Sequence, residues 1–156
     1  MILRKLGRTG GERIFMTLRN SDTTAIAAGH WMAYDTVTDR DGVGVDKPAA
    51  KLLNKIAGVS MSPLAAGEYG MFQVWGICPI TKAKGSTQTT TLALTCGSPL
   101  AIATSGFYPT RFAVTTTASN AAYAKQGSIG IVMGAATAAN YSAATSTVYT
   151  VFVTCL

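Results

Sequence analysis

The chain has 156 residues, of which 48% are hydrophobic and 13% charged, and its formal net charge is +6. This length predicts one domain, or one domain with an elaboration, that buries roughly two thirds of its unfolded surface. No apolar run approaches the roughly 20 residues of a membrane helix, and the N-terminal stretch lacks the apolar core of a secretory signal, so we expect folding in a reducing cytoplasm.

The cysteine pattern favours neither a disulfide framework nor a zinc site. The three cysteines, Cys78, Cys96 and Cys155, are an odd number at wide spacings without a C-x-x-C pair. We therefore expect buried free thiols. Low charge combined with abundant Ala, Thr, Ser and Gly leaves a weakly solvated surface, which predicts association with copies of the chain or with a partner.

Residues 1–11 predict a flexible N-terminal arm, because glycines interrupt a stretch that has no periodic apolar face. Its basic residues are candidates for contact with an acidic neighbouring surface; a solvated tail and a nucleic-acid contact are the alternatives. No strand precedes the glycines and no Gly-Lys-Ser/Thr follows them, so they do not form a phosphate loop. The candidate partner-binding residues are Arg4, Lys5, Arg8 and Arg13.

Residues 12–19 predict the first strand, and the polar residues 20–22 predict a turn. Residues 23–35 form a β-rich segment broken at Gly29, and the two segments together predict an antiparallel pair. His30 is the only histidine and stands in an apolar segment without visible catalytic or metal-binding partners. We therefore expect it to be structural.

Residues 35–42 are rich in aspartate but lack the alternating ligands and closing Glu of a calcium loop, so they predict a turn ending at Asp41 and Gly42. Residues 46–58 predict one short helix, with Asp46 as a candidate N-cap, a proline near the first helical position and Gly58 as the stop. An extended connection that enters a strand at Ala57 is the alternative.

Residues 64–78 contain the predicted central strand, in which a turn at residues 67–70 leads into β-branched and aromatic residues. Both faces of this strand are expected to meet other protein, and Gly76 predicts a bulge or a close backbone approach. We assign Trp31, Phe72 and Trp75 to packing, either in the core or between subunits.

The second half predicts further antiparallel sheet. Segments of strand length lie at residues 89–95, 112–117, 128–133 and 147–154, separated by turn signals that include residues 97–99 and 108–109. The last segment alternates strongly and is expected to pair internally or with a partner. All seven acidic residues lie within residues 1–68, and residues 85–156 carry only Arg111 and Lys125 as charges.

Four stretches resemble the layout of tailed-phage capsid decoration, or cement, proteins of the β-tulip type: GERIFMTLRN (11–20), GHWMAYD (29–35), IAGVS (56–60) and LAAGEYGMFQVWGI (64–77). The resemblance covers roughly residues 11–84. It implies a role on the outside of an icosahedral shell, often as a trimer, where such proteins bridge neighbouring major capsid proteins. The second half departs from the smallest members, which end soon after this strand.

The predicted fold is therefore all-β, with a β-tulip or antiparallel β-barrel-like core at residues 12–84. Residues 85–156 add an antiparallel elaboration, and at most one short helix is expected. The expected function is that of a virion structural protein on the capsid exterior. Its partners would be the major capsid protein and further copies of the chain, without direct contact to nucleic acid or membrane.

An enzyme is not expected, because the chain has one histidine, no acidic residue after Glu68 and no motif with catalytic spacing. No cofactor and no metal are expected either. The alternative function is another virion assembly or recognition module, such as a tail component, a head-fibre base or a carbohydrate-binding β-domain. The candidate residues for stacking on sugar rings are Tyr108, Tyr123, Tyr141 and Tyr149.

Overall fold

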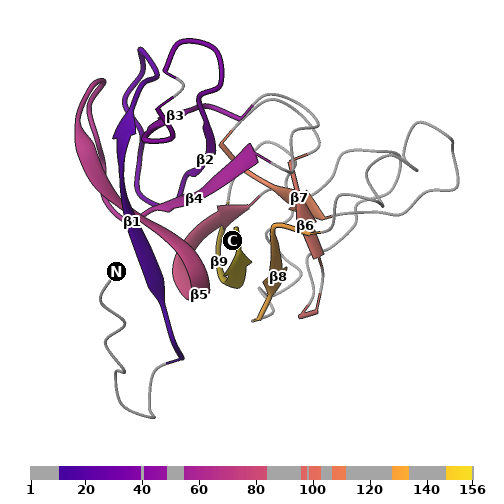
Figure 1. The fold of residues 1–156 in the computed structure, drawn as a ribbon. Helices are drawn as coiled ribbons and strands as arrows, with labels where there is room; N and C mark the ends of the chain where they lie inside the picture. Colours follow the sequence, from indigo (N-terminus) through magenta and orange to yellow (C-terminus); the bar gives the residue numbers. More distant parts are fainter. Residues whose placement is uncertain are drawn as a thin grey trace, which may run out of the picture.

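The computed structural model describes residues 11–39, 41–48, 55–83, 96–97, 99–102, 107–111, 128–133 and 147–155. This part of the chain forms strands and no α-helix, which confirms the predicted all-β fold (Figure 1). The strands are β1 (Ile14–Asn20), β2 (Trp31–Tyr34), β3 (Gly44–Asp46), β4 (Ile56–Ser60), β5 (Tyr69–Ala83), β6 (Pro99–Ala101), β7 (Thr110–Arg111), β8 (Gly130–Val132) and β9 (Thr147–Thr154).

The first five strands close into a barrel-like ring, in the order β1-β3-β2-β4-β5 and back to β1. All of these pairs are antiparallel except β1 and β3, which run parallel. The predicted direct pairing of the first two strands is wrong, because β3 lies between them. The turn after Asp35 folds β3 back onto β2, so β3 takes the side of β2 that faces β1.

Four more strands extend the sheet from β5 in the order β9-β8-β6-β7, all antiparallel. β9 occupies the predicted segment 147–154 and lies between β5 and β8, which confirms internal pairing. β6 and β7 were not predicted as strands; β6 begins at the last residue of the turn signal at residues 97–99, and β7 directly follows the one at residues 108–109. Pro99 is the first residue of β6 and Pro109 directly precedes β7, positions at which proline is compatible with a strand.

The predicted helix is wrong over residues 56–58, where the chain forms β4 instead, in line with the extended alternative. Local helix propensity is overridden because Ile56, Ala57 and Val59 are buried while β4 pairs with β2 on one side and β5 on the other. Residues 49–54 of the predicted helix lie outside the described part of the chain, as do the predicted strands at 89–95 and 112–117.

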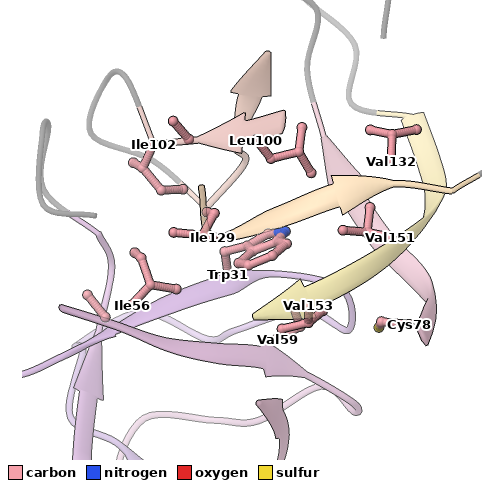
Figure 2. Close-up of a cluster of buried hydrophobic side chains, with 12 residues drawn as sticks. Trp31, Ile56, Val59, Cys78, Leu100, Ile102, Ile129, Val132, Val151 and Val153 are labelled. Atoms are coloured by element: carbon pink, nitrogen blue, oxygen red, sulfur yellow. The ribbon is translucent and has the colours of Figure 1, made fainter. Parts of the chain in front are cut away.

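Two hydrophobic cores lie on opposite faces of the ring wall. Trp31 and Ala33 of β2 belong to one core, whereas Met32 between them belongs to the other. The ring core contains Leu18, Ile26, Met32, Val45, Ala57, Leu64 and Phe72. The second core, shown in Figure 2, joins β2 and β4 to β6, β8 and β9 through Trp31, Val59, Leu100, Ile102, Ile129, Val132, Val151 and Val153. Strands with both faces covered show little polar alternation, as in the fully buried β4.

β5 is the central strand, as predicted, because it pairs with β1, β4 and β9. One extra residue, Val74, separates Gln73, which is opposite Phe15, from Trp75, which is opposite Ile14. This bulge exchanges the two faces of β5: Phe72 lines the ring core before it, and Cys78 lines the second core after it. Gly76 has a φ of 94°, and a Cβ there would overlap the carbonyl oxygen of Glu12, which confirms the predicted close backbone approach.

Candidate interaction surface

An exposed apolar surface lies on the outside of the β1–β5 pair. We call it the β1–β5 outer face and define it by Phe15, Thr17, Tyr69 and Met71. Thr17 is directly opposite Met71, and Arg19 is opposite Tyr69, so these side chains share one face of the pair. Phe15 is 40% exposed, Met71 53% and Tyr69 61%. Exposed large apolar side chains that gather in this way are typical of a protein-binding site.

The register explains why this face remains open. Gln73 lies on the same face, two residues beyond Met71, and is fully buried opposite Val59 of the second core. The strands that cover the second core join β5 through β9, which pairs only with β5 residues from Trp75 onward. The N-terminal end of β5 therefore extends past the covering strands and keeps its outer face in solvent.

Two arginines lie beside this face: Arg19 within β1 and Arg13 directly before it. Their surroundings differ. Arg19 forms an ion pair with Asp39, and this contact raises the pKa of the Arg19 guanidinium. Arg13 is exposed and lies two residues before Phe15. The other predicted partner-binding residues, Arg4, Lys5 and Arg8, lie outside the described residues and immediately precede this end of β1 in the sequence.

The predicted packing residues occupy three different places. Trp31 lies in the second core and Phe72 in the ring core, both without exposed surface. Trp75 is half-buried and contacts Phe152 of β9 edge to face, with 5.2 Å between the ring centroids and an interplanar angle of 78°. None of the three belongs to the β1–β5 outer face.

His30 connects residues 107–108 to the ring of strands. Its Nδ1 accepts a hydrogen bond from the Ala27 backbone N–H at 3.2 Å, and its Nε2 lies 3.2 Å from the Tyr108 hydroxyl. Its ring stacks on Phe107 at 4.3 Å, and the Phe107 carbonyl accepts the Trp31 backbone N–H at 3.0 Å. Both ring nitrogens of His30 are thus engaged in contacts that hold the chain together.

Two aspartates, Asp35 and Asp41, organise the turn between β2 and β3. Asp35 accepts the backbone N–H groups of Val37 and Thr38, each at 2.9 Å, and these bonds lower the pKa of its carboxyl group. Asp41 accepts the N–H of Val43 at 2.8 Å, and Gly42 has a φ of 79°. This geometry confirms the predicted turn. No group of three or more potential metal ligands occurs within the residues that the structure describes.

The three thiols are free, as predicted, but only Cys78 is fully buried. Cys155 is partly buried, and burial raises the pKa of its thiol to about 12. Cys96 is exposed, so the prediction of burial is wrong there. It stands in a turn with Gly97 at a φ of 84°, which leaves its side chain at the surface.

The sequence reasoning missed Phe15, Tyr69 and Met71 as surface residues. A signal was present in β1, where Phe15, Thr17 and Arg19 alternate with Leu18 on the ring-core side, but exposure of the face depends on where β9 joins β5.

No segment in the described ranges is a helix able to cross a membrane. Comparisons of the chain with protein-family models, with curated proteins and with solved structures find no match.

Proposed function

We propose that this chain is a structural protein of a virus particle that binds the outside of an icosahedral capsid and stabilises it by bridging major capsid proteins. The observation that carries the proposal is the β1–β5 outer face, with Arg13 at its rim and a basic segment directly before it in the sequence. A surface of this kind fits an apolar protein patch edged by carboxylates.

The positions of the resembling stretches in the fold are consistent with this proposal. The stretches that resemble capsid decoration proteins, at residues 11–20, 29–35, 56–60 and 64–77, contain β1, β2, β4 and the first half of β5. These are four of the five ring strands. The resemblance thus coincides with the closed ring, and the ring displays the exposed face.

Repetition by symmetry makes a modest surface sufficient. Fully burying one exposed large apolar side chain contributes about 1.5–3 kcal/mol, and each of the three large side chains on the outer face, which are about half exposed, would contribute about half of that. When a protein contacts two neighbouring shell subunits at once, the second contact forms at high effective concentration. Many weak contacts can then together stabilise the shell.

Copy number in the particle is the primary test. Quantitative mass spectrometry of purified particles of the encoding virus should give about one copy per major capsid protein, or about one per three, as closed symmetric contacts over the shell require. A count of about a dozen or fewer would reassign the chain to a vertex, portal or tail. Absence from the particle would refute the proposal.

Three variants locate the contact. Met71→Asp should weaken binding to particles that lack the protein, because it places a charge in the apolar face. Val37→Asp is the matched control, since Val37 is 78% exposed but lies on the turn that follows Asp35, outside the face. Deleting residues 1–10 should weaken binding more at low salt than at high salt, because salt screens exposed charges. Equal binding of all forms at both salt concentrations would refute the assignment of the contact to the β1–β5 outer face and the N-terminal segment.

A recognition module that binds carbohydrate is the second candidate, and the exposure of Tyr69 favours it, because an accessible aromatic ring can stack on a sugar. Among the tyrosines predicted for this role, Tyr108 packs edge to face against His30 at 5.2 Å. A glycan array probed with the intact chain and with Tyr69→Ala separates the two candidates. Binding lost in Tyr69→Ala would favour the carbohydrate role.

A further inference from the structure

An aromatic cluster around His30 lies where the ring of strands meets the segment that leads into β7. His30 directly precedes β2 and is only 7% exposed. Its ring stacks on Phe107 with 4.3 Å between the ring centroids, and the ring of Tyr108 meets it edge to face at 5.2 Å. Residues 107–109 directly precede β7. A single imidazole therefore contacts both aromatic residues of this segment.

The hydrogen bonds of His30 define its protonation state. Nδ1 accepts the backbone N–H of Ala27 at 3.2 Å, so Nδ1 carries no proton. The proton of the neutral ring is then on Nε2, which lies 3.2 Å from the Tyr108 hydroxyl and donates to its oxygen. The bond from Ala27 exists only while the imidazole is neutral.

A second proton on the imidazole would break this arrangement. It would bind Nδ1, where it would face the Ala27 N–H, so that one donor opposes another. The ring would have to move away from Ala27, and the aromatic residues stacked on it would lose their present support. Protonation of His30 is thus coupled to the attachment of residues 107–108.

The charges around the cluster also oppose a cationic imidazole. The Lys47 ammonium nitrogen lies 5.6 Å from the centroid of the Phe107 ring, so a charged His30 would add a second cation to the same cluster. The acidic groups beside Lys47 are Asp22, whose carboxylate accepts the Lys47 backbone N–H at 3.3 Å, and Asp46, which precedes it in the chain. Tyr108 is a further titratable group in contact with the ring.

Phe107 covers apolar side chains that its release would expose. It is half-buried and packs against the ring core. Its carbonyl accepts the backbone N–H of Trp31, the first residue of β2, at 3.0 Å. Movement of residues 107–108 away from the ring would therefore uncover part of the ring core and free the Trp31 amide.

We propose that His30 is an acid-sensitive switch: the neutral imidazole holds Phe107 and Tyr108 against the ring, and protonation of Nδ1 releases residues 107–108 and exposes the part of the ring core that Phe107 covers. The contact is complete at neutral pH and is lost in mild acid. The inference goes beyond the capsid role and is independent of it, because it concerns the isolated chain.

The expected pH range follows from the chemistry of histidine. A solvated imidazole takes up its second proton near a pKa of about 6.5. Because the released state binds this proton at Nδ1 and the attached state does not, each pH unit below that value should favour release by about tenfold.

Nuclear magnetic resonance of the intact chain between pH 8 and pH 5 tests the proposal. The hydrogen-exchange protection factor of the Trp31 amide should fall about tenfold per pH unit below about 6.5, while that of the Ile26 amide, which donates to Leu64 within the ring at 2.8 Å, should stay constant. Since His30 is the only histidine, its ring resonances are assigned directly, and they should titrate together with the resonances of the Phe107 ring.

His30→Asn is the matched variant, because the Oδ1 of asparagine can accept the Ala27 N–H in place of Nδ1 but does not titrate in this range. Its Trp31 protection factor should not change with pH. His30→Gln repeats the test if circular dichroism shows that His30→Asn does not fold. Tyr108→Phe should keep the pH dependence of the native chain, because Nδ1 and its bond from Ala27 remain.

Three results would overturn the proposal: a Trp31 protection factor in the native chain that is the same at pH 8 and pH 5, an equal loss of protection in the folded His30 variants, or an equal loss at Ile26, which would indicate unfolding of the whole ring.

Discussion

Replacing Asp46 with asparagine should stabilise the protein at neutral pH. Asp46 ends β3 and is partly buried, and burial together with the charges of Asp35 and Asp22 raises the pKa of its carboxyl group from 3.8 to about 6. The ionised form is therefore favoured less in the folded chain than in the unfolded chain. At pH 7 the group is ionised in both states, so its charge opposes folding.

The size of the effect follows from the shift. A rise from 3.8 to about 6 is about two pKa units, and each unit corresponds to about 1.4 kcal/mol. The upper limit is therefore about 3 kcal/mol, and solvent screening of a partly buried group reduces it to about 1 kcal/mol. Because the folded pKa is the higher one, the penalty falls as pH drops through about 6, and it is absent below about 4, where Asp46 is protonated in both states.

Urea denaturation followed by tryptophan fluorescence at pH 8, 6 and 4 measures this dependence. The midpoint for Asp46→Asn should exceed that of the native chain at pH 8 and equal it at pH 4. Asp41→Ala should instead lower the urea midpoint at neutral pH, since the Val43 backbone N–H lowers the pKa of Asp41 and the ionised carboxylate stabilises the turn. A gain for Asp46→Asn that is the same at every pH would refute the electrostatic reasoning.

Two further substitutions test the construction of β5. Gly76→Ala should lower the free energy of unfolding by about 3 kcal/mol, because it combines a positive φ with overlap on Glu12. Gly67→Ala should lower it by only about 1 kcal/mol, since Gly67 also has a positive φ but a Cβ there meets nothing within 4 Å. Equal losses in urea denaturation would contradict the close approach at Gly76. Thr81→Val should raise the unfolding free energy by about 1 kcal/mol, because the Thr81 hydroxyl is fully buried and has no hydrogen-bond partner among the described residues. A loss of stability measured by calorimetry would instead point to a partner for it.

Local sequence patterns located several strands. β8 and β9 lie within the predicted segments and β1 and β5 overlap theirs, because alternation and β-branched residues are signals that depend only on neighbouring side chains. The turn at residues 35–42 was also predictable, since Asp35 and Asp41 bond to backbone N–H groups two residues ahead. Gly76 was predicted to mark a bulge or close approach, and Val74 and Glu12 account for both.

Pairing partners were less accessible from the sequence. The insertion of β3 between β1 and β2 depends on a parallel contact between residues Arg19 and Gly44, which no local pattern encodes. β6 and β7 are too short for an alternation signal, and prolines at their starts imitate turns. In β4, pairing on both sides outweighed the helix pattern of the residues before it.

By itself, the sequence determined an all-β chain with a central strand, a basic N-terminal segment and an almost uncharged second half, because composition and period-two alternation are local properties. Only the tertiary structure decided which apolar residues remain in solvent. Phe15 and Phe72 are both strand aromatics, yet Phe15 is exposed and Phe72 is buried. The ring encloses the face that carries Phe72, whereas β9 pairs with β5 only from Trp75 onward and so does not cover the face that carries Phe15. Which faces remain exposed therefore follows from strand register, and strand register depends on contacts between residues far apart in the sequence.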